Sequence, residues 1–202
     1  MPIPWRWLLV LMACTPLQAG DGMAAAHERL QAWRAFKPQL ETLDERTRVE
    51  AVNRFFNRIV AYGKDSEAWG RPDYWATPME TLRRGAGDCE DYAIAKYFAL
   101  QAIGIPASRL RLFYVRLHPG QAGGAWSKEH VVLGYYPLDE TEPLILDNLI
   151  ATLYPAPQRT DLAVLFSFDR DSVEFDDARH PLEALPPWLA LLLRMQTQDG
   201  LS

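Results

Sequence analysis

The stretch from Gly85 to Leu100 constrains the fold of this chain more than any other segment. It opens with Gly-Ala-Gly, which allows a tight turn, and continues in a helix-compatible pattern that runs to Gly104. Asp88 is a favourable N-cap residue, so the sequence predicts a helix that begins at Cys89. The thiol would then lie in the first turn, where free N–H groups and the helix dipole stabilise a thiolate. The segment therefore predicts a nucleophilic cysteine that needs a base from elsewhere in the chain.

The first 19 residues are typical of a secretory signal peptide. Arg6 precedes an apolar run from Trp7 to Ala13, and Leu17–Ala19 offers a small-residue cleavage site. The apolar run is too short to span a membrane. The alternatives are a lipoprotein signal ending at Cys14, which Met12 fits poorly, and a buried first helix. We expect an exported protein with no membrane span after cleavage.

Removal of residues 1–19 would leave 183 residues, enough for one domain over 20–202 with its own core. The removed part holds Arg6 and no acidic residue, so the formal net charge moves from −5 to −6. Such a surface does not recruit nucleic acid or anionic lipid over a broad area. Cys89 would be the one remaining cysteine, which excludes an internal disulfide and favours a chemical role. An inert buried cysteine is the alternative.

The residue pattern predicts helices before the cysteine and strands after it. The expected helices outside the cysteine segment cover residues 27–36, 43–62, 78–84 and 186–195, with a loop over 64–73. A capping box from Thr77 to Glu80 opens the third of these helices. The expected strands cover 110–117, 130–136, 143–147 and 162–168. Helices followed by meandering strands predict an α+β domain with an antiparallel β-sheet.

His130 is the candidate base, because the group that activates the thiol must also return a proton to the leaving amine. His27 and His180 are interpreted as surface residues, and His118 is a weaker candidate beside a glycine-rich loop. His130 opens a predicted strand, and Asp147 ends the adjacent predicted strand. If these strands pair, the Asp147 carboxylate can orient the His130 ring and stabilise its imidazolium form. Ordinary surface polarity is the alternative for His130 taken alone.

Three carboxylates, Asp88, Glu90 and Asp91, crowd the cysteine. Their negative charge disfavours the thiolate and is expected to raise the pKa of Cys89. Hard oxygen ligands of this kind suit Ca²⁺, whose charge would offset that effect. The alternative is that the three acids only cap the helix and complement its dipole. The chain has no EF-hand loop and no recognisable zinc-ligand spacing.

The sequence Gly-Asp-Cys89-Glu-Asp-Tyr-Ala, followed by His130 and by Leu-Asp147-Asn, resembles the transglutaminase-like cysteine proteinase superfamily. Within it, the chain is similar to the periplasmic LapG-type proteases, over most of the length after residue 19. The resemblance implies a papain/transglutaminase-like fold, with Cys89 as nucleophile, His130 as base and Asp147 as the orienting acid. It also implies calcium dependence, with the acids that flank the cysteine, Asp88, Glu90 and Asp91, as ligands.

The resemblance further implies a location and partners. In that family the substrate is a large surface adhesin, cleaved near its N-terminus at an Ala-Ala bond so that cells leave a biofilm. The periplasmic part of an inner-membrane cyclic-di-GMP receptor sequesters the protease. Two other functions fit the same residues: a transglutaminase-type acyl transferase, in which an amine captures the thioester, and a non-catalytic protein-binding module of the same fold.

Three smaller expectations concern the surroundings of the cysteine. The backbone N–H of Cys89 is expected to stabilise an oxyanion. Trp69 and Trp75 are more typical of core residues than of catalytic ones. The glycine-rich loop 118–129, which includes Trp126, is expected to gate access for a substrate.

Overall fold

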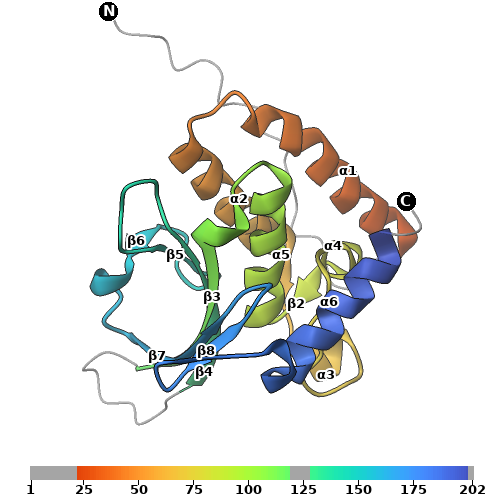
Figure 1. Cartoon of the computed structure of the whole chain (residues 1–202). Helices are drawn as coiled ribbons and strands as arrows, with labels where there is room; N and C mark the ends of the chain where they lie inside the picture. Colours follow the sequence, from red (N-terminus) through yellow and green to blue (C-terminus); the bar gives the residue numbers. More distant parts are fainter. Residues whose placement is uncertain (1–21, 119–127, 200–202) are drawn as a thin grey trace, which may run out of the picture.

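The structure, a computed structural model, describes residues 22–118 and 128–199 (Figure 1). The expected signal peptide and most of the expected gating loop, with Trp126, lie outside the described residues. Helices precede an antiparallel sheet with strand order β6-β5-β4-β3-β7-β8-β9, which confirms the α+β expectation. No helix in the part of the chain that the structure describes is both long and apolar enough to cross a membrane.

The helices are α1 (Met23–Leu40), α2 (Glu45–Ile59), α3 (Asp65–Ala68), α4 (Pro78–Arg84), α5 (Cys89–Ala102) and α6 (Pro186–Asp199). The strands of the large sheet are β3 (Leu110–Leu117), β4 (Lys128–Tyr135), β5 (Leu144–Leu146), β6 (Tyr154–Pro155), β7 (Leu162–Phe168), β8 (Val173–Phe175) and β9 (Ala178–His180). Two further short strands, β1 (Ala61–Tyr62) and β2 (Ala86–Gly87), pair in parallel.

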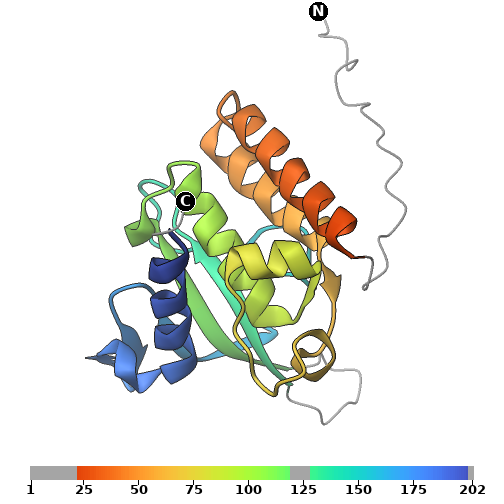
Figure 2. The same cartoon turned by 90° about the vertical axis from the view of Figure 1, so that its right-hand side faces the viewer.

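Helices α1 and α2 lie side by side and cover one side of the domain (Figure 2). Asp44 caps α2 by accepting the Thr47 backbone N–H at 3.0 Å, and the apolar face of α2 is buried. Phe36 of α1 stacks on Phe55 of α2 with 4.8 Å between ring centroids. Helix α1 is longer than the predicted 27–36, because Pro38 lies close enough to the helix end to remove only one late hydrogen bond.

The segment that leads into the cysteine follows the predicted order with two corrections. Thr77 and Glu80 form the expected capping box of α4, and Gly85 ends that helix at φ 70°. The expected turn at 85–87 becomes the short strand β2, held against β1 through the Gly63 N–H and the Gly87 carbonyl at 2.9 Å. The expected loop 64–73 contains α3, which is too short to show a helical periodicity in the sequence.

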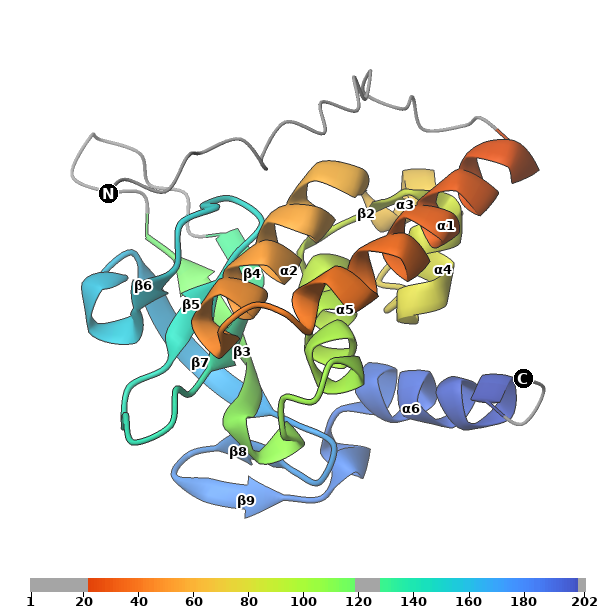
Figure 3. The ribbon, with the colours of Figure 1, turned by 90° about the horizontal axis from the view of Figure 1, so that it is seen from above.

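Helix α5 is the centre of the domain. Figure 3 shows it enclosed by α2, α4 and α6, with the sheet on its remaining side. Most of its side chains are buried, as expected for a helix that is apolar on nearly all faces. Because this packing fixes α5 from every side, its N-terminal residue, Cys89, has a fixed place beside β4.

The sheet matches the predicted strands and adds three short ones. β3 pairs with both β4 and β7, and β4 pairs with β5 in antiparallel register. β4 begins two residues before the expected start, so His130 is its third residue and lies opposite Val115 of β3. β6, β8 and β9 were not predicted, because two or three residues are too few for a visible alternation.

The final helix α6 covers the other side of α5 and begins at the predicted Pro186. Trp188 is fully buried, and its ring contacts those of Tyr97, Phe98 and Phe168. Its indole N–H donates to the Asp169 carbonyl at 2.6 Å. A tryptophan of α6 therefore closes the core between α5 and β7.

Replacing Trp188 with alanine is expected to lower the free energy of unfolding by about 3–5 kcal/mol, because the change leaves a large cavity in the core. Urea denaturation measures the difference. Leu193→Ala on the same helix is the matched control, since Leu193 is 54% exposed; it is expected to change stability by no more than about 0.5 kcal/mol. Equal losses in the two variants would contradict this account of the core.

Candidate active site

Cys89 occupies the first position of α5, as the sequence predicts. Its thiol donates a hydrogen bond to Oε2 of Glu90 at 3.0 Å. The backbone N–H of Val131 on β4 lies near the sulfur and slightly favours the thiolate, because it lowers the pKa of Cys89. The thiol is therefore held between the tip of α5 and the residue that follows His130.

Asp88 precedes the helix in the extended conformation of an N-cap residue, but its carboxyl group makes no capping hydrogen bond. The capping role expected for this side chain is therefore wrong. Its Oδ1 atom is buried and has no hydrogen-bond partner among the described residues. A buried carboxylate oxygen without a donor is costly, which indicates that this group serves another purpose.

His130 and Asp147 form a buried pair. The His130 ring is 3% exposed, and its Nε2 atom lies 2.8 Å from Oδ1 of Asp147. This contact leaves Nδ1 as the ring nitrogen available for proton exchange with another group. The expected juxtaposition of these two residues is thus present, and His130 is not a surface histidine.

The backbone around Asp147 is tied to α2 as well as to the sheet. β5 pairs with β4 up to Leu146, which lies opposite Leu133, so Asp147 leaves the sheet on the side toward His130. The Asn57 side chain of α2 donates to the Asp147 carbonyl at 2.8 Å, and Asn53 donates to the Ala151 carbonyl at 2.9 Å. These two amides fix the loop that carries the carboxylate.

Arg159 is a site residue that the sequence analysis missed. It is 5% exposed, and its Nη2 atom donates to Oδ2 of Asp147 at 2.9 Å. Burial by itself would raise the pKa of Asp147, but hydrogen bonds from His130, Leu149 and Arg159 outweigh that effect and lower the pKa to about 2. Arg159 sits in a Pro-Gln-Arg-Thr-Asp stretch that reads as a solvent-exposed turn, so the sequence carries no signal for its role.

The carboxylates near the cysteine belong to a larger acidic cluster. Asp88, Glu90 and Asp91, predicted as ligands, are joined by Asp65 and Asp73 from the segment before α4. Within each of three overlapping groups, one ligand atom per residue lies within 4.8 Å of the others. Asp65 and Asp73 were not predicted as ligands, although two acids that bracket a loop are a weak signal for a cation site.

Burial and mutual repulsion dominate the electrostatics of this cluster. Burial, reinforced by neighbouring carboxylates, raises the pKa of Asp91 to about 8 and that of Asp65 to about 6. Burial first and Glu90 second also raise the pKa of the Cys89 thiol, in the direction the sequence predicts. Oδ1 of Asp65, like Oδ1 of Asp88, is buried and receives no hydrogen bond from the residues that the structure describes. Several hard oxygens with unsatisfied buried lone pairs fit a divalent cation such as Ca²⁺.

Two tryptophans hold acids of this cluster by their indole N–H groups. Trp69 donates to Oδ2 of Asp91 at 3.2 Å, and Trp75 donates to Oδ1 of Asp73 at 3.1 Å. Trp75 is a core residue as expected, whereas Trp69 is only partly buried. Their indoles therefore position carboxylates of the cluster.

The remaining histidines lie apart from the pair. His27 and His118 are exposed, which agrees with the prediction that His27 is a surface residue and His118 a weaker candidate base than His130. His180 is half-buried and stacks on Phe175 with 3.6 Å between ring centroids, so its interpretation as a solvated residue is wrong. No described contact joins any of these three rings to Cys89.

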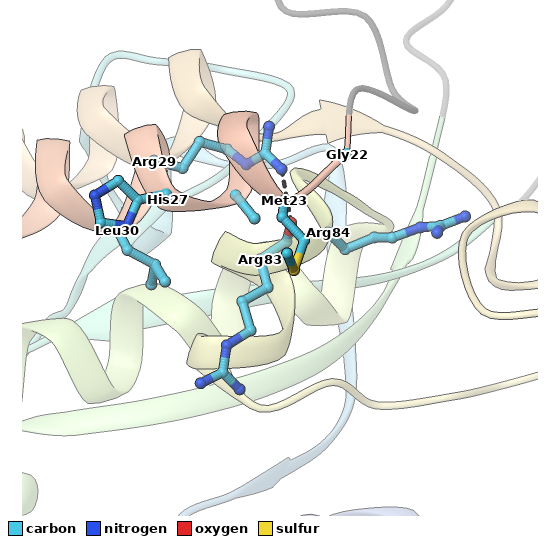
Figure 4. Close-up of a pocket in the computed structure, with 8 residues that line it drawn as sticks. Gly22, Met23, His27, Arg29, Leu30, Arg83 and Arg84 are labelled. Atoms are coloured by element: carbon cyan, nitrogen blue, oxygen red, sulfur yellow. Dashed lines mark hydrogen bonds between the residues drawn. The ribbon is translucent and has the colours of Figure 1, made fainter.

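A separate pocket of about 500 Å³ lies between α1 and α4 (Figure 4). Arg29 crosses its floor and donates to the Leu82 and Arg83 carbonyls at 2.7 and 2.6 Å. These bonds satisfy carbonyls at the end of α4 and tie the two helices together. The lining residues are Gly22, Met23, Ala26, His27, Arg29, Leu30, Arg83 and Arg84. The pocket therefore contains none of the residues near the cysteine.

Comparison with known proteins agrees with this geometry. Residues 26–161 match the family model described as bacterial transglutaminase-like cysteine proteinase BTLCP. The chain belongs to this family of cysteine proteinases. The match spans α2, α5, the strand β4 that carries His130, and Asp147 just after β5, and it ends at Asp161.

Among solved structures the chain is similar to LapG from Legionella pneumophila. The EGTA-treated form has 35% sequence identity and a TM-score of 0.71, covering 84% of this chain and 89% of that one. The calcium-bound form has 36% identity and a TM-score of 0.70, covering 85% of this chain and 91% of that one. The fold is therefore the transglutaminase-like fold of LapG. No curated protein sequence matches the chain.

Replacing Gly87 with alanine is expected to disturb the cluster, because a Cβ atom there would collide with the Asp91 carboxyl group. Overpacking of this kind costs about 1–3 kcal/mol. The matched control is Gly63→Ala on the paired segment, where a Cβ would lie an ordinary 3.6 Å from that of Ala86. Urea denaturation in metal-free buffer compares the free energies of unfolding of the two variants. If Gly87→Ala leaves the stability unchanged, Asp91 is not fixed against β2.

Proposed function

We propose that this chain is a calcium-dependent cysteine endopeptidase of the LapG type, exported to the periplasm, that uses Cys89, His130 and Asp147. The observation that carries the proposal is the buried His130–Asp147 pair, 2.8 Å between Nε2 and Oδ1, next along β4 to Val131, whose backbone N–H acts on the Cys89 thiol. Membership in a cysteine proteinase family supports it.

The proposed reaction begins when His130 takes the thiol proton of Cys89. The sulfur then attacks the carbonyl carbon of a peptide bond, and the backbone N–H of Cys89 stabilises the oxyanion. The C–N bond breaks as His130 returns the proton to the leaving amine, which leaves a thioester on the enzyme. Water attacks the thioester carbon while His130 accepts its proton. The C–S bond then breaks, the second product leaves as a carboxylic acid, and His130 returns the proton to the sulfur, which restores the free thiol.

Asp147 would act on this reaction through the histidine. A carboxylate that is ionised at neutral pH holds one ring nitrogen, which leaves the other free to exchange a proton with the thiol, and it stabilises the imidazolium form. The low pKa of Asp147 keeps the group charged through the whole physiological range.

The proposed calcium site consists of Asp88, Glu90 and Asp91, as the sequence analysis expects, together with Asp65 and Asp73. When bound, the cation would offset the negative charge that disfavours the thiolate of Cys89. The unpartnered oxygens of Asp65 and Asp88 support this assignment. Calcium-bound and EGTA-treated forms exist for the similar LapG of Legionella pneumophila.

The proposed substrate is the N-terminal region of a large exported adhesin, cleaved at an Ala-Ala bond to control biofilm detachment. The proposed inhibitor is the periplasmic domain of an inner-membrane cyclic-di-GMP receptor. Both proposals rest on the resemblance to the LapG type, as does the assignment of residues 1–19 as a signal peptide. An acyl transferase would use the same thioester but pass it to an amine.

Incubating the adhesin N-terminal region with the enzyme and sequencing new N-termini tests the proposed protease. Cleavage is expected with the wild type and not with Cys89→Ala. Asp147→Asn should lower kcat/KM by about 10²- to 10⁴-fold, because a neutral amide no longer favours the imidazolium. Asp139→Asn is the control: Asp139 is exposed at φ 67°, a conformation that asparagine tolerates.

Other outcomes separate the alternatives. Amine incorporation into a glutamine substrate without chain cleavage would favour the acyl transferase. No labelling of Cys89 by iodoacetamide at neutral pH, together with no cleavage, would favour the non-catalytic binding module.

Thermal unfolding with and without calcium tests the metal site. At calcium about 100-fold above Kd, the melting temperature of the wild type is expected to rise by about 5 °C or more. Asp65→Asn should reduce this rise, since it removes a charged ligand, while Asp139→Asn should leave it unchanged. Full proteolysis in excess EGTA, with no thermal shift on adding calcium, would contradict the site.

A further inference from the structure

Asp147 has a cationic partner behind it, on the side opposite His130. Oδ1 of Asp147 accepts from His130 at 2.8 Å and from the Leu149 N–H at 3.0 Å. Within residues 22–118 and 128–199, Oδ2 accepts from Arg159 alone, at 2.9 Å. Arg159 therefore controls the second oxygen of the carboxylate, which sets the rotation of the whole group.

Arg159 is itself held by groups other than Asp147. Its Nε and Nη2 atoms donate to the two carboxylate oxygens of Asp161, at 2.9 and 2.7 Å. Its backbone N–H binds the Ala156 carbonyl and its carbonyl accepts from Leu162, both at 3.0 Å. The Asp161 carbonyl accepts from His118 at 2.8 Å, which ties this segment to the end of β3. These contacts hold the guanidinium group in place independently of its hydrogen bond to Asp147.

The charges that face Asp147 come from every element packed around it. β4 contributes His130, α5 contributes the buried Lys96, and the segment before β7 contributes Arg159 and Asp161. From α2, the neutral amide of Asn57 donates to the Asp147 carbonyl. Arg159 is the cation that touches the carboxylate directly, and a fully buried carboxylate without such a partner is strongly destabilised.

We propose that Arg159 is a positioning residue of the proposed protease: it holds the Asp147 carboxylate ionised and oriented so that Oδ1 meets the His130 ring. This inference rests on the proposed function and adds a fourth side chain to it. Arg159 does not touch Cys89 in any described contact, so it acts through Asp147. Buried partners of this kind, placed behind a reacting group, fix its orientation.

The geometry calls for arginine and not for a generic cation. One nitrogen, Nη2, lies between the carboxylates of Asp147 and Asp161, while Nε of the same plane binds Asp161. A lysine has a single ammonium and cannot keep both contacts of this planar fork. Arg159→Lys is therefore expected to preserve the charge but to lose part of the orientation.

The test compares Arg159→Met and Arg159→Lys with the wild type in kcat, KM and the pH profile of kcat/KM. Arg159→Met should lower kcat by about 10- to 100-fold with little change in KM. Its acidic limb should move to higher pH, because one of the donors that lower the pKa of Asp147 is gone. Arg159→Lys should restore part of kcat and bring the acidic limb back toward that of the wild type.

Arg111→Met is the matched control for the loss of a largely buried arginine. Arg111 lies on β3, has 13% of its side chain exposed, and pairs with Asp169 and Glu174 instead of Asp147. Its loss should lower stability without shifting the acidic limb. If Arg159→Met does not fold, Arg159→Lys and Asp161→Asn carry the test, since both keep a cation beside Asp147. Asp161→Asn should lower kcat several-fold by loosening the guanidinium.

The rate at which iodoacetamide labels Cys89 gives a readout that needs no peptide substrate. It should fall in the two Arg159 variants and stay unchanged in Arg111→Met, even if the adhesin proves to be the wrong substrate. The proposal is overturned if Arg159→Met keeps kcat and labelling within twofold of the wild type. It is also overturned if Arg159→Met and Arg159→Lys lose the same activity with no movement of the acidic limb. Absence of any cleavage or labelling in the wild type would instead reject the proposed function.

Discussion

The packing of α5 against β4 is the contact on which the rest of the site depends. α5 is enclosed by helices on three sides and by the sheet on the fourth, so its N-terminal residue cannot move without disturbing the core. Since α5 packs against β4 and the Val131 N–H acts on the Cys89 thiol, the helix tip lies beside the strand that carries His130. The side chain of His130 then follows from its position in that strand, and Asp147 follows from the pairing of β5 with β4.

The same arrangement crowds negative charge around the thiol. Cys89 begins a helix, which favours a thiolate, yet Glu90 and Asp88 oppose it and burial reinforces their effect. A helix N-terminus offers about half a unit charge, which is too little to balance five neighbouring carboxylates. The metal-free site is therefore electrostatically unsatisfied, and the unpartnered oxygens of Asp65 and Asp88 are its structural trace. In the proposed function, the cation and the reactive cysteine therefore depend on the same cluster of side chains.

The sequence predicted those parts of the site that depend on residues close together in the chain. The Gly-Asp start of α5 and the alternating strands were visible in the residues, and adjacency of the predicted strands was enough to bring Asp147 toward His130. Asp65 and Asp73 were not predicted, because the four-residue helix that begins at Asp65 shows no periodicity. The approach of Asp65 to Asp88, and of Asp73 to Glu90, depends on how the loop folds back. Arg159 could not be predicted from its own segment, because nothing there distinguishes it from a solvent-exposed arginine in a turn. Its burial arises only when the chain folds.

Asp147 and Asp91 show how one residue type takes two roles in a single site. Both are buried, and burial alone raises the pKa of each. Asp147 receives a histidine, an arginine and a backbone N–H, so it stays charged and available to orient a ring. Asp91 receives one indole and one backbone N–H and faces other acids, so its charge lacks a cationic partner among the described side chains. The donors that surround each carboxylate, more than its depth in the protein, therefore separate a group suited to orienting the base from one suited to binding a cation.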